Sequence, residues 1–111
     1  MTQLTGFKQD HIGSYIDKDP GAVLTYSIDW SDWLYGGDAI ASTLWTVTAI
    51  TEDPAGTALR IVSYGFLNDV SYAQIDRGTT GEIYTVTCKI TTTEGNTDFR
   101  KFRIKVNPRY L

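Results

Sequence analysis

The chain contains little of what enzymes and metal sites ordinarily use. Its 111 residues include one histidine, His11, and one cysteine, Cys88. A single cysteine excludes an internal disulfide framework and a cysteine-rich zinc site. The sequence also lacks a glycine-rich phosphate loop, a dinucleotide-binding fingerprint and a Gly-x-Ser-x-Gly nucleophile motif. We therefore expect a protein that is not an enzyme, with no catalytic residues, no cofactor and no metal ligands.

Basic residues and long apolar runs are also scarce. Lysine and arginine number 10 against 13 acidic residues, which gives a net charge of -3, whereas nucleic-acid binders normally carry a basic excess. No apolar run approaches the roughly 20 residues that span a bilayer, and the first ten residues lack the apolar stretch of a signal peptide. A content of 41% hydrophobic and 21% charged residues is typical of one folded domain. These features predict neither a nucleic-acid nor a membrane partner.

What the sequence does contain is apolar residues that recur every second position, which is the period of a β-strand. The clearest example is the stretch 83–91, where apolar residues alternate with threonines and a lysine. The Glu94–Asn96 segment is a strong turn signal, and the chain then returns through alternating apolar residues to about residue 107, so that 82–107 is predicted to be a hairpin. Phe99 is out of phase with this return strand, which predicts a bulge or a late strand start.

Weaker alternation predicts four further strands, in the stretches 24–30, 45–49, 59–66 and 70–75. Several short strands separated by turn signals are typical of a sandwich or a barrel. We therefore predict an all-β fold, an immunoglobulin-like antiparallel β-sandwich of about six to seven strands with an extended N-terminal arm. The predicted division is an arm at 1–18, the sandwich at 19–107 and a C-terminal tail at 108–111.

Three side chains in these strands are predicted to have structural roles. Tyr84, at the start of the penultimate strand, matches the position from which a tyrosine hydroxyl anchors a corner of immunoglobulin-type sandwiches. Trp45 is interpreted as the aromatic residue that packs across from this strand. Cys88 is in phase with Val86 and Ile90, so we interpret it as a small buried hydrophobic residue rather than a nucleophile.

The stretch from residue 29 to residue 38 could carry a binding site. Its three carboxylates could ligate calcium, but they lack EF-hand spacing, and aspartate is common in turns for its own hydrogen bonds. Its aromatic residues could form a platform on which a sugar stacks, although at least one ring is in phase with the core. We prefer the interpretation that the carboxylates serve turns and the rings serve the core. The candidate calcium ligands are Asp29, Asp32 and Asp38. The candidate sugar-stacking rings are Trp30, Trp33 and Tyr35.

Basic residues gather near the C-terminus. One interpretation is the solvated face of an edge strand, kept charged to prevent aggregation between sheets. The alternative is an electrostatic contact with an acidic neighbour. The first is preferred, and the residues concerned are Arg100, Lys101, Arg103, Lys105 and Arg109.

Three segments of the chain carry a recognisable pattern. The first, Lys18–Trp30, is KDPGAVLTYSIDW; the second combines Gly37–Ser42 with Trp45–Val47; the third is Tyr84–Val106. Together they resemble a family of small virion proteins of tailed bacteriophages, over about residues 18–107. The first segment is the most distinctive, because the third is also shared with generic immunoglobulin-like repeats.

The resemblance implies an immunoglobulin-like fold and a non-enzymatic virion structural protein, with no catalytic residues to transfer. The preferred interpretation is an adaptor that joins tail fibres or other components to the tail. A capsid decoration or cement protein and a carbohydrate-binding attachment module are the alternatives. The implied partners are other virion proteins (tail, fibre, portal or capsid subunits) in a symmetric oligomeric assembly, and the implied location is the tail or head–tail region of the virion, after synthesis in the host cytoplasm.

Overall fold

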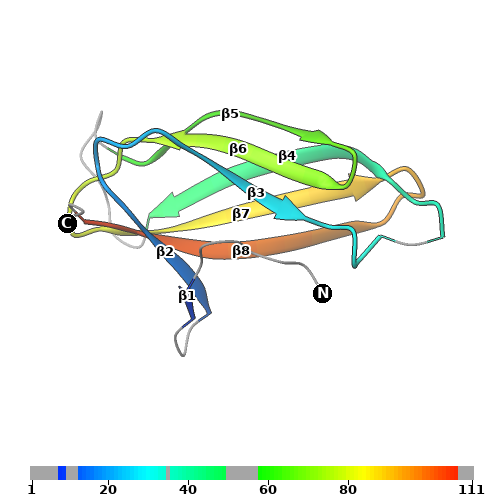
Figure 1. Ribbon diagram of the computed structural model, residues 1–111, viewed down its shortest axis with the longest axis horizontal. Helices are drawn as coiled ribbons and strands as arrows, with labels where there is room; N and C mark the ends of the chain where they lie inside the picture. The colour runs from blue at the N-terminus through cyan, green and yellow to red at the C-terminus, as the bar shows by residue number, and fades with distance from the viewer. Residues whose placement is uncertain (1–7, 10–12, 35, 50–57, 108–111) are drawn as a thin grey trace.

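A computed structural model describes residues 8–9, 13–34, 36–49 and 58–107. The described residues form eight strands and no helix (Figure 1). The two-residue β1 precedes seven longer strands, and the bounds are β1 Lys8–Gln9, β2 Ser14–Lys18, β3 Leu24–Asp29, β4 Ile40–Ala49, β5 Arg60–Leu67, β6 Val70–Asp76, β7 Ile83–Thr92 and β8 Thr97–Val106. The described part of the chain holds no helix of the length and hydropathy that a membrane crossing requires.

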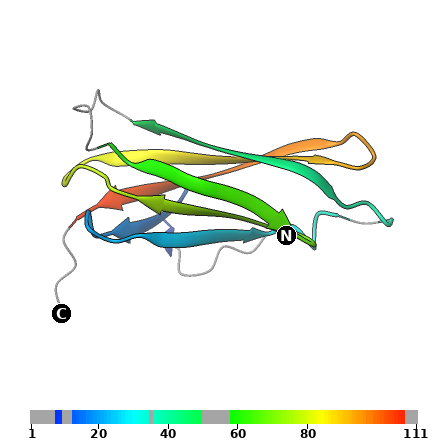
Figure 2. The same ribbon diagram turned by 90° about the horizontal axis from the view of Figure 1, so that it is seen from above.

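The strands form two sheets that pack face to face. One sheet has five strands in the order β1-β2-β8-β7-β4, and the other has three in the order β3-β6-β5. Figure 2 shows β5 and β6 in front of the strands of the larger sheet. The sets β4-β7-β8 and β3-β6-β5 match the two sheets of an immunoglobulin domain, in which the third, sixth and seventh strands pair and the second, fifth and fourth pair. The predicted immunoglobulin-like β-sandwich is thus confirmed.

The core lies between the sheets and follows the predicted alternation. Every second side chain of β7 is fully buried, from Tyr84 to Ile90, and so are Ile104 on β8 and Ile75 on β6. Trp45 on β4 is 3% exposed and pairs with Cys88 across the sheet. Full burial of one such apolar side chain stabilises the folded state by about 1.5–3 kcal/mol.

The hairpin of β7 and β8 differs from the prediction at one point. Phe99 pairs with Lys89 in a register that runs without interruption from Ile83 to Thr91. The predicted bulge and late strand start are therefore wrong, since β8 begins at Thr97. Phe99 is out of phase because its ring lies on the outer face of the sheet, where it is 49% exposed and the Lys89 ammonium sits 6.0 Å from its centre.

Part of the predicted N-terminal arm belongs to the larger sheet. Strand β2 pairs with β8, and this is the one parallel pairing among the described strands. Lys18 at its end is fully buried, and its ammonium donates to the carbonyl oxygens of Asp19 at 2.9 Å and Arg77 at 2.7 Å. Burial lowers the pKa of Lys18, and the nearby Asp76 and Asp19 carboxylates offset part of that effect. Residues 1–7, 10–12 and 108–111 lie outside the described residues, so the predicted boundaries of arm and tail stay predictions.

Candidate functional site

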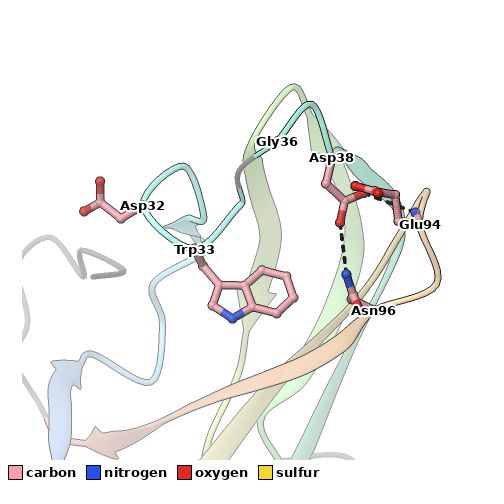
Figure 3. A pocket seen from close by; sticks show the side chains of 6 residues that line it. All are labelled: Asp32, Trp33, Gly36, Asp38, Glu94 and Asn96. Carbon is pink, nitrogen blue, oxygen red and sulfur yellow. Dashed lines mark hydrogen bonds between the residues drawn. The ribbon is translucent and has the colours of Figure 1, made fainter.

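A polar hollow of about 600 Å³ opens at one end of the sandwich. It lies where the loop between β3 and β4 meets the turn between β7 and β8 (Figure 3). The backbone N–H of Thr93 donates to the carbonyl oxygen of Ala39 at 2.9 Å and ties the two segments together. The residues that line the hollow are Asp32, Trp33, Gly36, Asp38, Glu94 and Asn96.

Asp38 is the carboxylate that joins the two sides of the hollow. It accepts hydrogen bonds from the Thr93 hydroxyl at 2.9 Å, the backbone N–H groups of Ala39 and Glu94 at 2.9 and 3.2 Å, and the Asn96 amide at 3.4 Å. Desolvation alone would raise the pKa of Asp38, but the hydrogen bonds, including one from Thr92, outweigh it and lower the pKa to about 2. Asp38 therefore stays ionised at neutral pH and fastens the β7–β8 turn to the loop before β4.

The three candidate calcium ligands do not come together. Asp29 accepts a hydrogen bond from the backbone N–H of Ser31 at 2.9 Å, which is the ordinary turn role of aspartate. The Asp32 carboxylate points away from that of Asp38 (Figure 3). Among the described residues, no three acidic, histidine or cysteine side chains lie close enough to hold a metal ion.

Of the two candidate sugar-stacking rings that the structure describes, Trp33 lines the hollow and Trp30 does not. Trp30 is fully buried, as its phase with Ile28 predicts, and Trp33 packs edge-on against it with ring centres 5.7 Å apart. Trp33 is half-buried and presents its remaining surface to the hollow (Figure 3). Tyr35 lies outside the described residues. Among the described residues, the site therefore offers the Trp33 ring beside carboxylates and an amide.

The predicted tyrosine corner is present. Tyr84 is fully buried, and its hydroxyl accepts a hydrogen bond from the backbone N–H of Thr79 at 3.0 Å. Thr79 lies five residues upstream, in the loop that precedes β7, which is the geometry of the corner in immunoglobulin-type sandwiches.

A small polar group joins the two sheets inside the core. The indole N–H of Trp45 donates to the Ser71 hydroxyl at 2.8 Å, and the hydroxyl of Thr43 lies 2.7 Å from that same oxygen. The Cys88 thiol donates to Ser71 at 3.3 Å, and burial raises the pKa of this thiol. A protonated, fully buried thiol is not a nucleophile. His11 lies outside the described residues.

The basic residues of β8 do not lie on an edge strand. Strand β8 is paired on both sides, with β2 and β7, so the interpretation as an edge kept charged is wrong. Arg103 donates to the carbonyl oxygen of Gly13 at 3.1 Å and lies 5.7 Å from the centre of the Tyr15 ring, while the Lys105 ammonium lies 3.8 Å from that centre. These two cations hold β2 against the sheet through cation–π contacts.

The remaining basic residues have different surroundings. Arg100 is on the inner side of β8, where it contacts the Asp98 carboxylate and its guanidinium lies 4.8 Å from the centre of the Trp30 ring. Lys101 is exposed, and Arg109 lies outside the described residues.

Strand β5 also carries a run of exposed apolar side chains that strand periodicity does not predict. The side chains of Val62, Tyr64, Phe66 and Leu67 are 45, 45, 38 and 69% exposed. A signal for it was available, because 61–67 is a run of seven residues without a charge or a proline.

Comparison with known proteins identifies a family for this chain. No curated protein matches the chain. Residues 18–105 match the family described as podophage GP4 fiber-tail adaptor protein gp77, a stretch that holds every strand from β3 to β7 and nearly all of β8. The chain therefore belongs to this family of phage fibre-tail adaptor proteins.

Proposed function

We propose that this chain is a non-enzymatic structural protein of the virion, which joins tail fibres to the tail of a podophage. The observation that carries the proposal is the family match, which extends over almost the whole sandwich. The architecture supports it, because sandwich domains offer open strand edges and end loops to which other proteins bind.

The chemistry of the described side chains also favours an assembly role. The Asp38 carboxylate, whose pKa is strongly lowered, accepts hydrogen bonds from its own loop and from the β7–β8 turn. The thiol of Cys88 is buried in the core. We infer that the chain works without a cofactor, and that its partners are tail, fibre, portal or capsid subunits in a symmetric assembly at the tail or head–tail region, reached after synthesis in the host cytoplasm.

Depletion of the chain from an infection tests this proposal. Particles assembled without it are expected to have tails but no attached fibres, when negatively stained particles are counted by electron microscopy. Supplying the intact chain from a plasmid is the control, and it should restore the fibres. Particles that keep their fibres and instead lose capsid stability would contradict the adaptor role and support the capsid decoration protein.

A second candidate function is carbohydrate binding, which the hollow favours because Trp33 lies beside carboxylates and an amide. A glycan array with the purified chain tests it, with Trp33→Ala as the variant and Tyr72→Ala, an exposed ring on β6, as the matched control. Binding that is lost only in the Trp33 variant would support the second function. An array without signal would dismiss it.

A further inference from the structure

Strand β5 is an edge strand with unusual chemistry. It ends the three-stranded sheet, and Figure 1 shows it along the upper boundary of the molecule. Natural edge strands normally carry a lysine, a proline or another charge that prevents pairing with a further strand. From Ile61 to Leu67 this strand has none of these. Within the described residues, the one feature that would hinder pairing is the register shift between Ile61 and Ser63.

The aromatic rings of β5 lie on the side of the sheet that faces the core. Tyr64 pairs with Ala73 and Phe66 pairs with Ser71, and both partners on β6 are fully buried. Side chains on these paired positions point to the same face of a sheet. The two rings nevertheless remain 45 and 38% exposed. The larger sheet therefore does not fully cover the apolar inner face at this edge.

The other described edges are different. On β3, the exposed positions are one apolar residue, Leu24, at the start of the strand and three polar ones, Thr25, Ser27 and Asp29, and none is aromatic. On β4, the exposed side chains are short or hydroxylated apart from Leu44, and β2 is partly covered by β1. Strand β5 is therefore the edge, among the described strands, at which the addition of an apolar strand would bury the most aromatic surface.

We propose that β5 pairs edge to edge with β5 of a second copy of this chain, antiparallel about a two-fold axis near Tyr64. The chain's own sequence is complementary in this arrangement. Val62 lies opposite Phe66 of the second copy, so that two apolar side chains meet. Ser63 lies opposite Gly65, so that two small residues meet. Two such edges give a closed, isologous interface.

The charges at the ends of β5 select the antiparallel direction. Arg60, which is half exposed and paired with Asp76 on its own copy, lies next to the Asn68–Asp69 turn of the second copy. A parallel pairing would instead place the two Arg60 side chains beside each other. Like charges directly opposite one another destabilise a sheet pairing, whereas opposite charges stabilise it.

The paired state joins two three-stranded sheets into one sheet of six strands, and it covers Tyr64 and Phe66 of both copies. Its role in the particle rests on the proposed function, for which it supplies a symmetric contact between subunits. Its test needs only the purified 111-residue chain.

Sedimentation velocity over a concentration series measures the association. The wild-type chain is expected to form a dimer, and Tyr64→Lys, which places a charge on the edge, is expected to weaken dimerisation at least about tenfold. The matched control is Thr25→Lys, which adds the same charge to the opposite edge of the same sheet and should leave dimerisation unchanged. Circular dichroism and fluorescence of the buried tryptophans check that both variants are folded.

Disulfide cross-linking gives a second readout that does not depend on the stability of the lysine variant. Across an antiparallel pair, opposite Cβ atoms lie about 4.5–5.5 Å apart, close enough for a disulfide to form after small shifts. Mild oxidation should convert Tyr64→Cys to a covalent dimer and leave Thr25→Cys monomeric, and the native Cys88 is buried and does not compete.

A chain that stays monomeric throughout the concentration series, or a dimer that survives Tyr64→Lys and does not cross-link at position 64, would overturn the proposal. Its failure is distinguishable from that of the adaptor role. A monomeric chain whose depletion removes the fibres leaves the adaptor role intact and refutes the β5 contact. A dimeric chain whose depletion leaves the fibres in place refutes the adaptor role and leaves the β5 contact intact.

Discussion

At the scale of single residues, the fold depends on polar side chains that satisfy backbone groups at the ends of strands. Tyr84 and Asp38 both do this, one in the core and one at the surface. Buried donors that lose their partner destabilise a protein more than a formed hydrogen bond stabilises it. Each residue therefore supports a direct test.

Replacing Tyr84 by phenylalanine should lower the free energy of unfolding by about 1–3 kcal/mol, because the Thr79 N–H loses its acceptor while the ring stays in the core. Urea denaturation measures the change. Tyr72→Phe removes a hydroxyl from a ring that is 39% exposed, and is expected to change stability by less than about 0.5 kcal/mol. Equal effects of the two substitutions would show that the corner hydrogen bond has no special role.

Asp38 should make stability depend on pH in the acid range. Its folded pKa of about 2 lies below the value of about 3.9 for an unfolded aspartate, so its contribution is complete above the unfolded pKa and is lost as the pH falls through the folded pKa. Chemical denaturation measures the free energy of unfolding at pH 5 and near pH 2. Between these two pH values, the free energy of unfolding should fall further for the wild type than for Asp38→Asn, because only the wild type loses the contribution of the Asp38 carboxylate.

The control for this pH dependence is Glu94→Gln. It removes a carboxylate from the same hollow but keeps the Glu94 backbone N–H that donates to Asp38. Its pH profile should follow the wild type. A profile for Asp38→Asn that also follows the wild type would show that the Asp38 contacts do not stabilise the folded state.

At the scale of elements, the attachment of β2 is the feature with the clearest physical cause. The strand has five residues, and isolated pairings of that length contribute little. Its outer side chain, Tyr15, lies beneath two cations of β8, and its inner side chain, Ile16, pairs with the buried Ile104. Cation–π contacts of about 0.5–1 kcal/mol each are comparable to the whole stability of so short a strand.

Tyr15→Ala should therefore loosen β2 while leaving the sandwich folded. Hydrogen exchange of the β2 amides is expected to accelerate several-fold more than exchange in β7. Tyr15→Phe keeps the ring and should retain the wild-type protection. If the alanine variant exchanged as slowly as the wild type in β2, the cations of β8 would not be what holds the strand.

At the scale of the whole molecule, the sequence predicted the sandwich because its buried strands alternate regularly. Tyr84 and Trp45 were placed correctly, since large aromatics in phase with aliphatic neighbours have one favourable environment. Periodicity cannot show which strands neighbour one another, so it does not reveal that β8 is paired on both sides or that Ser14–Lys18 joins the larger sheet. Periodicity also cannot show that the larger sheet leaves part of the inner face of β5 uncovered, because that exposure depends on the offset between the two sheets.

The pairing of β2 with β8 decides how far the N-terminus can be shortened without loss of stability. Deletion of residues 1–18 would remove β2 and the buried Lys18, and so leave the outer edge of β8 without its parallel partner. Deletion of residues 1–13 stops just before β2. The free energies of unfolding of the two truncated chains should differ by about 2–4 kcal/mol, from the lost burial of Ile16 and the lost backbone hydrogen bonds of the β2–β8 pairing. Thermal and urea denaturation measure this difference, and equal stability of the two truncations would mean that the sandwich begins at β3.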